Sequence, residues 1–145
     1  MFDLRPTQGH DMFVAFGIKL LMDAYPSARI LAVDCEAGWT MIDEAPMCPV
    51  LEGYRPDAIV ALADCVVLLE AKSIADVGSE RSLEQYRRVE SLMSGNERLK
   101  FFLTVFGAPV GATSRYLALP TWMSVGDRVQ VSVFSEKWVE EYETV

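Results

Sequence analysis

The feature that most constrains this chain is a pair of short apolar runs, residues 58–62 and 65–69, separated by only two residues. This spacing predicts two antiparallel strands joined by a short turn. Pairing across that turn sets Asp57 directly opposite Glu70. Lys72 projects from the same face as Glu70, because side chains two positions apart on a strand share a face. Two opposed carboxylates repel each other, so we expect a fold that keeps them there to hold a cation between them.

The same residues form a recognisable motif. Pro56-Asp57, twelve intervening residues and Glu70-Ala71-Lys72 resemble the signature of the PD-(D/E)XK nuclease superfamily. The resemblance implies a restriction-endonuclease-like fold and hydrolysis of DNA phosphodiester bonds with Mg²⁺ or Mn²⁺. It also implies that Asp57, Glu70 and the Ala71 carbonyl hold the cation, and that Lys72 orients the attacking water. The biological setting would be DNA repair, recombination, restriction or a mobile element.

A plainer interpretation is an ordinary hairpin that exposes its polar ends, with Lys72 only neutralising Glu70. Two further interpretations are a catalytically inactive scaffold with the nuclease fold, and an acidic interaction protein that mimics nucleic acid and inhibits another enzyme. Replacement of Lys72 by alanine discriminates between an active nuclease and an inhibitor. It should abolish nuclease activity but leave inhibition intact.

Length and composition fit a single domain over residues 1–145. Of the 145 residues, 51% are hydrophobic and 23% are charged, which is typical of a globular chain that buries a core without disulfides. The three cysteines are odd in number and lack CxxC spacing, so neither a disulfide framework nor a zinc site is indicated. We find no membrane-spanning segment or signal-peptide pattern in the sequence, and we expect a cytoplasmic protein.

The net charge of −8 counts against a simple nucleic-acid-binding protein, because phosphate affinity comes largely from Lys and Arg. Seven of the thirteen basic residues nevertheless lie between positions 55 and 100, around the predicted site. The sequence therefore predicts weak, local binding of DNA. It leaves room for a homodimer or a protein partner that supplies further DNA affinity.

Residues 11–25 carry apolar side chains at helical spacing and are followed by a proline, so they predict a first helix. The polar residues Asp11, Lys19 and Asp23 form one stripe, in which Lys19 and Asp23 are close enough to pair. The stripe is either a solvated face or a source of a further metal ligand, because many members of the resembled superfamily add an acidic residue from the first helix. Asp11 is the candidate. The single histidine, His10, is either a cap or surface residue or an extra ligand.

A second helix is predicted over residues 82–93, where Ser82 and Gln85 have the spacing of a capping box and a Ser-Gly pair follows as a stop. Arg81, Gln85 and Arg88 fall on one face of this helix. The resemblance implies that Gln85 supports the catalytic site. Arg81 and Arg88 are candidates for phosphate contact, with a solvated helix face as the equal alternative.

The remaining β-rich runs are residues 28–35, 99–106, 115–119 and 128–134. The last run alternates apolar and polar residues, as a half-buried edge strand does, and a short closing helix is predicted around residues 138–142. The order of elements predicts an α/β fold with an αβββαβ core over roughly residues 10–106. In this fold a central mixed sheet is flanked by helices and extended by extra C-terminal strands.

Overall fold

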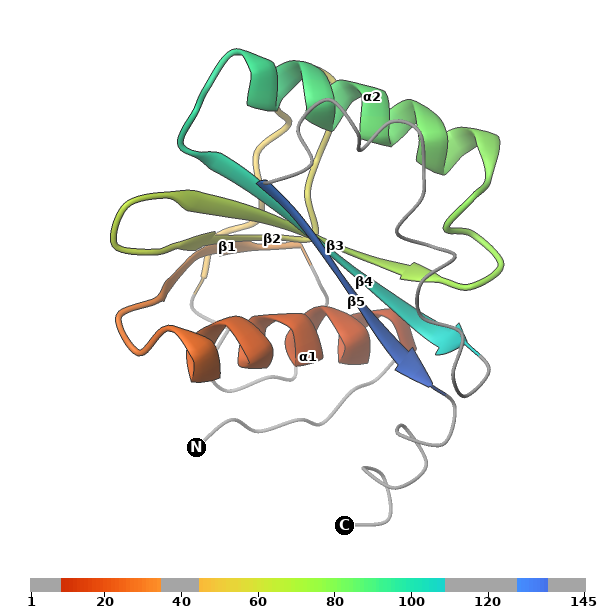
Figure 1. The fold of residues 1–145 in the computed structure, drawn as a ribbon, viewed down its shortest axis with the longest axis horizontal. Helices are drawn as coiled ribbons and strands as arrows, with labels where there is room; N and C mark the ends of the chain where they lie inside the picture. The colour runs from red at the N-terminus through yellow and green to blue at the C-terminus, as the bar shows by residue number, and fades with distance from the viewer. Residues whose placement is uncertain (1–8, 35–44, 109–127, 136–145) are drawn as a thin grey trace, which may run out of the picture.

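The computed structural model describes residues 9–34, 45–108 and 128–135 of the chain. In chain order the elements are α1 (Gly9–Ala24), β1 (Arg29–Val33), β2 (Ala58–Ala61), β3 (Val66–Ser73), α2 (Glu80–Ser94), β4 (Leu99–Ala108) and β5 (Val129–Ser135). The five strands form one sheet in the order β1-β2-β3-β4-β5, with α1 on one face and α2 on the other (Figure 1). The predicted α/β class, with a mixed sheet between helices, is confirmed.

Strand pairing follows the predicted hairpin. β2 and β3 are antiparallel, with Ala58 opposite Leu69 and Ala61 opposite Val66. The paired register ends there: the Asp57 amide donates to the Leu69 carbonyl over 3.0 Å, so the Asp57–Glu70 pair that the sequence predicts is not part of it. β1 pairs antiparallel with β2, whereas β4 pairs parallel with β3 and with β5. The parallel pairing of β3 and β4 requires a crossover, and α2 lies in that connection.

Each face of the sheet has its own core. The α1 side buries Val67, Leu69 and Ala71 of β3 together with apolar residues of the helix. The α2 side buries the intervening Leu68 with residues of β4 and α2. Because side chains alternate along a strand, Glu70 and Lys72 project on the same side as Leu68. The charged end of β3 therefore faces α2.

The predicted first helix is confirmed as α1, and the predicted ion pair between Lys19 and Asp23 forms. The helix lies close to the sheet at Gly17, where an added Cβ would lie 2.8 Å from Leu69 Cδ1 and 3.1 Å from Thr104 Cγ2. A glycine at this position lets the helix backbone approach the strands. His10 and Asp11 belong to the first turn of α1, but their side chains lie outside what the structure describes.

The predicted second helix is also confirmed, but its N-cap is not the predicted one. α2 begins at Glu80, and Ser79 is the cap, with its hydroxyl accepting a hydrogen bond from the Ser82 amide over 3.2 Å. Ser82 lies buried within the first turn. Because Ser79 satisfies the first turn, Gln85 is not needed to cap it, and its amide is available for the site.

β5 forms one edge of the sheet, as its alternating sequence predicts. Just before it, Arg128 donates hydrogen bonds to the carbonyls of Met93, Asn96 and Leu99, at the end of α2 and in the turn into β4. The Met93 carbonyl lies in the last turn of α2, where carbonyls have no partner within the helix itself. The predicted strand at 115–119 and closing helix at 138–142 lie outside the described residues. Within those residues, neither helix is long and apolar enough to cross a membrane.

Candidate active site

A cavity of about 690 Å³ lies on the α2 side of the sheet. Five side chains predicted from the sequence as catalytic or DNA-binding line it: Asp57, Glu70, Lys72, Arg81 and Gln85. Ala71, predicted to offer its carbonyl, lines it as well. These residues come from β3, the segment before β2 and the first turns of α2, so the hairpin register and the crossover helix together assemble the site.

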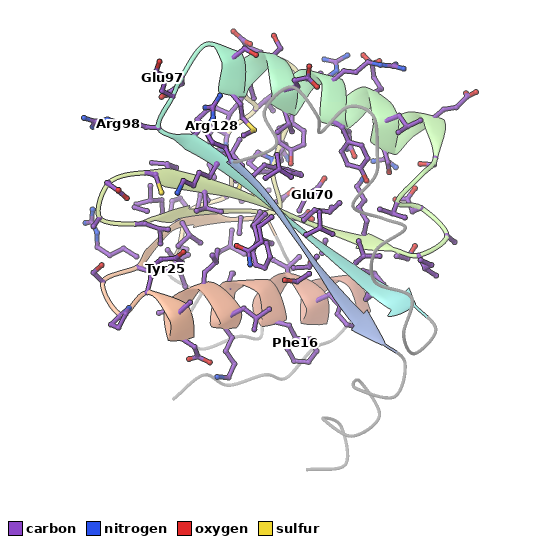
Figure 2. All side chains as sticks on the ribbon, in the orientation of Figure 1. Phe16, Tyr25, Glu70, Glu97, Arg98 and Arg128 are labelled. Carbon is purple, nitrogen blue, oxygen red and sulfur yellow. The ribbon has the colours of Figure 1, made fainter. Side chains whose placement is uncertain are left out.

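The charged residues of the hairpin are buried. Asp57, Glu70 and Lys72 are 9%, 4% and 6% exposed, respectively. Figure 2 shows Glu70 between the sheet and α2. The burial of all three residues contradicts the interpretation of an ordinary hairpin whose polar ends reach solvent. Ionisable groups are seldom buried unless they are paired or bind a cation.

Asp57 is oriented by the neighbouring strand. Its Oδ2 atom accepts a hydrogen bond from the Ala71 amide over 2.8 Å. This bond crosses from β3 to the residue just before β2, so it fixes the carboxylate against the strand that carries Glu70. A hydrogen bond from a backbone amide favours the ionised form of a carboxylate.

The Glu70 carboxyl is strongly perturbed by its surroundings. Burial raises the pKa of Glu70 well above its usual value, the adjacent Asp57 carboxylate raises it further, and the Lys72 ammonium acts in the opposite direction. Its Oε2 atom is buried and has no hydrogen-bond partner among the described residues. An acceptor of this kind is costly to leave unpaired.

Lys72 is held between an amide and two carboxylates. Its Nζ atom donates a hydrogen bond to Gln85 Oε1. The same nitrogen lies 3.7 Å from Glu70 Oε1 and 3.7 Å from Asp76 Oδ2. The contact with Gln85 matches the supporting position that the sequence resemblance implies for this residue.

Three charged residues that line the cavity are absent from the sequence-predicted set: Asp34, Arg55 and Asp76. Asp34 follows β1, and its amide donates to the Asp57 carbonyl over 2.7 Å. Arg55 lies two positions before Asp57, a spacing that could have indicated it. Asp76 lies four positions after Lys72 and also accepts a hydrogen bond from the Ser79 hydroxyl.

The two arginines predicted to contact phosphate differ in their surroundings. Arg81 lines the cavity, and its guanidinium has no hydrogen bond or ion pair with another residue that the structure describes. Arg88 is not among the described residues that line the cavity. Its guanidinium lies 3.5 Å from Glu84 Oε1 and donates to the Glu52 carbonyl. That carbonyl belongs to a turn at Glu52 and Gly53, which have φ angles of 49° and 84°. A Cβ at Gly53 would overlap the Arg88 guanidinium, so a glycine suits both the turn and this contact.

The donor set fits a hard divalent cation. Asp57 and Glu70 offer buried carboxylate oxygens, one of them unpartnered, and Ala71 lines the same cavity. No group of three or more His, Cys, Asp or Glu side chains that could hold a metal ion is found in residues 9–34, 45–108 and 128–135. Mg²⁺ does not require such a group, because it usually keeps several waters and binds through one or two carboxylates.

The raised pKa of Glu70 predicts how the metal-free protein responds to pH. A carboxyl whose pKa is higher in the folded state binds its proton more tightly when folded, so its ionisation destabilises the fold as pH rises above the ordinary value of 4.5. Glu70→Gln should therefore be more stable than the native protein at pH 7 in EDTA. The difference should shrink as pH falls, by up to about 1.4 kcal/mol per pH unit, and vanish near pH 4.5.

Urea unfolding at several pH values in EDTA measures this difference. Glu84→Gln is the matched control, because the Glu84 side chain is 52% exposed on α2. Its stability relative to the native protein should vary little with pH. Parallel pH profiles for Glu70→Gln and the native protein would contradict the perturbed state of Glu70.

Comparison with family models, with curated proteins and with solved structures finds no match to this chain. The function of the protein is therefore inferred from the residues of the cavity and their geometry.

Proposed function

We propose that the protein is a metal-dependent nuclease of the PD-(D/E)XK type that hydrolyses phosphodiester bonds of DNA. The observation that carries this proposal is the pairing of two buried carboxylates, Asp57 and Glu70, with the buried Lys72 in one cavity. Burying three ionisable groups costs free energy, and buried, perturbed ionisable groups cluster at functional sites. The order of elements from α1 to β4 is α-β-β-β-α-β, which supports assigning a restriction-endonuclease-like fold.

Asp57, Glu70 and the Ala71 carbonyl would hold Mg²⁺ or Mn²⁺. The bound cation would activate a water and offset negative charge at the phosphate. Lys72 would donate hydrogen bonds to the attacking water and to a phosphate oxygen, where negative charge develops in the transition state. Gln85 would keep the ammonium in place through the hydrogen bond that it accepts. The water oxygen bonds to phosphorus as one ester oxygen leaves.

Cleavage assays test this proposal directly. The purified protein is incubated with plasmid, linear duplex and branched DNA, with Mg²⁺ or Mn²⁺ and with EDTA. We expect cleavage of at least one substrate that requires the cation and is lost in Asp57→Ala. A native protein that binds Mn²⁺ but cuts none of the substrates would favour an inactive scaffold or an obligate protein partner.

We assign phosphate contact to Arg55 and Arg81. Both line the cavity, and within the described part of the chain neither guanidinium has an ion pair or hydrogen bond. Each arginine that binds a phosphate contributes about one unit to the slope of log affinity against log salt concentration. Arg55→Ala and Arg81→Ala should each weaken DNA binding and lower that slope by about 1. Fluorescence anisotropy with labelled duplex in EDTA, at several salt concentrations, measures both quantities.

Arg87→Ala is the matched control for these two variants. Arg87 lies on α2 with Arg81, its side chain is 64% exposed, and it pairs with Glu84 over 3.2 Å. Replacement of Arg87 should leave the slope unchanged. Arg88→Ala should have a smaller effect than Arg81→Ala, because the Arg88 guanidinium already contacts the Glu84 carboxylate and the Glu52 carbonyl. Equal slopes for the native protein and the Arg55→Ala and Arg81→Ala variants would count against phosphate binding in this cavity.

A further inference from the structure

Two buried side-chain atoms lack a hydrogen-bond partner in the described part of the chain, the Tyr54 hydroxyl oxygen and Glu70 Oε2. Unpaired buried polar atoms are costly and rare in native proteins. These two are chemically complementary, because a phenol donates a hydrogen bond and a carboxylate oxygen accepts one. The unpaired donor could therefore satisfy the unpaired acceptor.

Tyr54 lies on the same side of the sheet as Glu70. It is 2% exposed and belongs to the α2-side core with Leu68, which shares a strand face with Glu70. Burial raises the pKa of Tyr54, and the largest electrostatic contribution comes from Glu70, followed by Asp57. Tyr54 is not among the described residues that line the cavity. Its hydroxyl is therefore buried outside the cavity lining.

The other groups near the Tyr54 hydroxyl are weaker partners. The Tyr86 hydroxyl already donates to the Val77 carbonyl over 2.7 Å. Burial raises the pKa of the Cys48 thiol to about 12, so it stays protonated, and a thiol sulfur is a weak acceptor. Asp57 Oδ2 accepts from the Ala71 amide. Glu70 Oε2 is the carboxylate oxygen that has no hydrogen-bond partner among the described residues.

We propose that Tyr54 is a positioning residue for Glu70: once a divalent cation is bound, its hydroxyl donates a hydrogen bond to Oε2 through one buried water and so holds the carboxylate toward the cation. This inference rests on the proposed function, because it takes Glu70 to be a metal ligand. A carboxylate oxygen has two lone pairs, so it can accept from Tyr54 and still face a cation. Partners of this kind commonly change metal affinity by about 10- to 100-fold.

The test compares Tyr54→Phe with Tyr86→Phe, which remove one hydroxyl each from the same core. Calorimetric titration gives the affinity for Mn²⁺, and thermal unfolding in EDTA gives the stability without metal. Tyr54→Phe should bind Mn²⁺ about 10- to 100-fold more weakly. Its unfolding midpoint in EDTA should equal or exceed that of the native protein, because the hydroxyl that it lacks has no partner there.

Tyr86→Phe should behave in the opposite way. Its midpoint in EDTA should fall, because the Val77 carbonyl loses its donor, while its Mn²⁺ affinity stays that of the native protein. Unchanged Mn²⁺ affinity in Tyr54→Phe would overturn the role of Tyr54, and so would equal losses of affinity in both variants. A native protein that does not bind Mn²⁺ at all would instead overturn the metal site of the proposed function, and the role of Tyr54 with it.

Discussion

Replacing Lys72 by methionine should lower the rate of DNA cleavage by about 100- to 1,000-fold. Methionine keeps a buried stem of similar length but removes the ammonium that bonds to Gln85 and lies 3.7 Å from Glu70 Oε1. Because the lost charge acts mainly on the transition state, kcat should fall much more than KM rises. Initial rates in Mg²⁺ over a range of DNA concentrations separate the two constants.

Binding of Mn²⁺ should survive this substitution or become tighter, because a positive charge is removed beside the two carboxylates. Lys100→Met is the matched control: Lys100 is exposed and lies opposite Val67 on β3, whereas Lys72 lies opposite Val105 on β4. It should cleave like the native protein. If Lys72→Met cleaved as fast as the native protein, the role assigned to this lysine would be wrong.

The largest expected loss of stability is at the contact between α1 and β3. Leu69 is fully buried, and Leu69→Ala should cost about 2–5 kcal/mol of unfolding free energy. Gly17→Ala should also destabilise the native protein, because its Cβ would lie 2.8 Å from Leu69 Cδ1. In the Leu69→Ala background the cost of Gly17→Ala should be smaller, because the contact with Leu69 is removed and alanine favours the helix by about 1 kcal/mol, whereas the contact at 3.1 Å with Thr104 Cγ2 remains. Urea unfolding of the four proteins in EDTA measures this coupling.

Gly78→Ala provides the control for the glycine substitution. Gly78 lies in the loop before α2, where an added Cβ would meet no atom within 4 Å. Its replacement should change stability by less than about 0.5 kcal/mol in either background. A Gly17→Ala effect of the same size with Leu69 and with Ala at position 69 would contradict the close packing of α1 on the sheet.

The hairpin could be predicted from sequence because its register depends only on local spacing. A two-residue turn between apolar runs favours this register, which brings Asp57 and Glu70 to the same end of the hairpin. The supporting position of Gln85 came from the resemblance rather than from spacing, and its contact with Lys72 is a finding of the structure. The boundary of α2 was less predictable, because both Ser79 and Ser82 are residues that cap helices well.

Asp34 could not be predicted, because its orientation depends on an irregularity of β1. Ile30 pairs with Val60 and Ala32 with Ile59, so the register shifts by one residue between them. Such a shift moves every later side chain to the opposite face. Simple alternation would put Asp34 on the same face as Ile30, toward α1. With the shift, Asp34 lines the cavity on the α2 side.

Arg88 shows a different limit of sequence reasoning. Helical spacing correctly groups it with Arg81 and Gln85, but spacing along one helix does not reveal which other segment that face meets. Here the turn at Glu52 and Gly53 reaches Arg88, and only the first part of the face borders the cavity. The packing partner comes from about 36 positions earlier in the chain.

The hydrogen bonds of Arg128 connect the end of α2 to the segment that leads into β5. α2 starts with a local cap at Ser79, but at its other end Met93 accepts from a residue 35 positions later. The Gly95 and Asn96 amides also donate to carbonyls of this last turn, so α2 has local caps at both ends. Arg128 adds a long-range contact that anchors the end of the helix that supports Lys72 to the segment leading into β5.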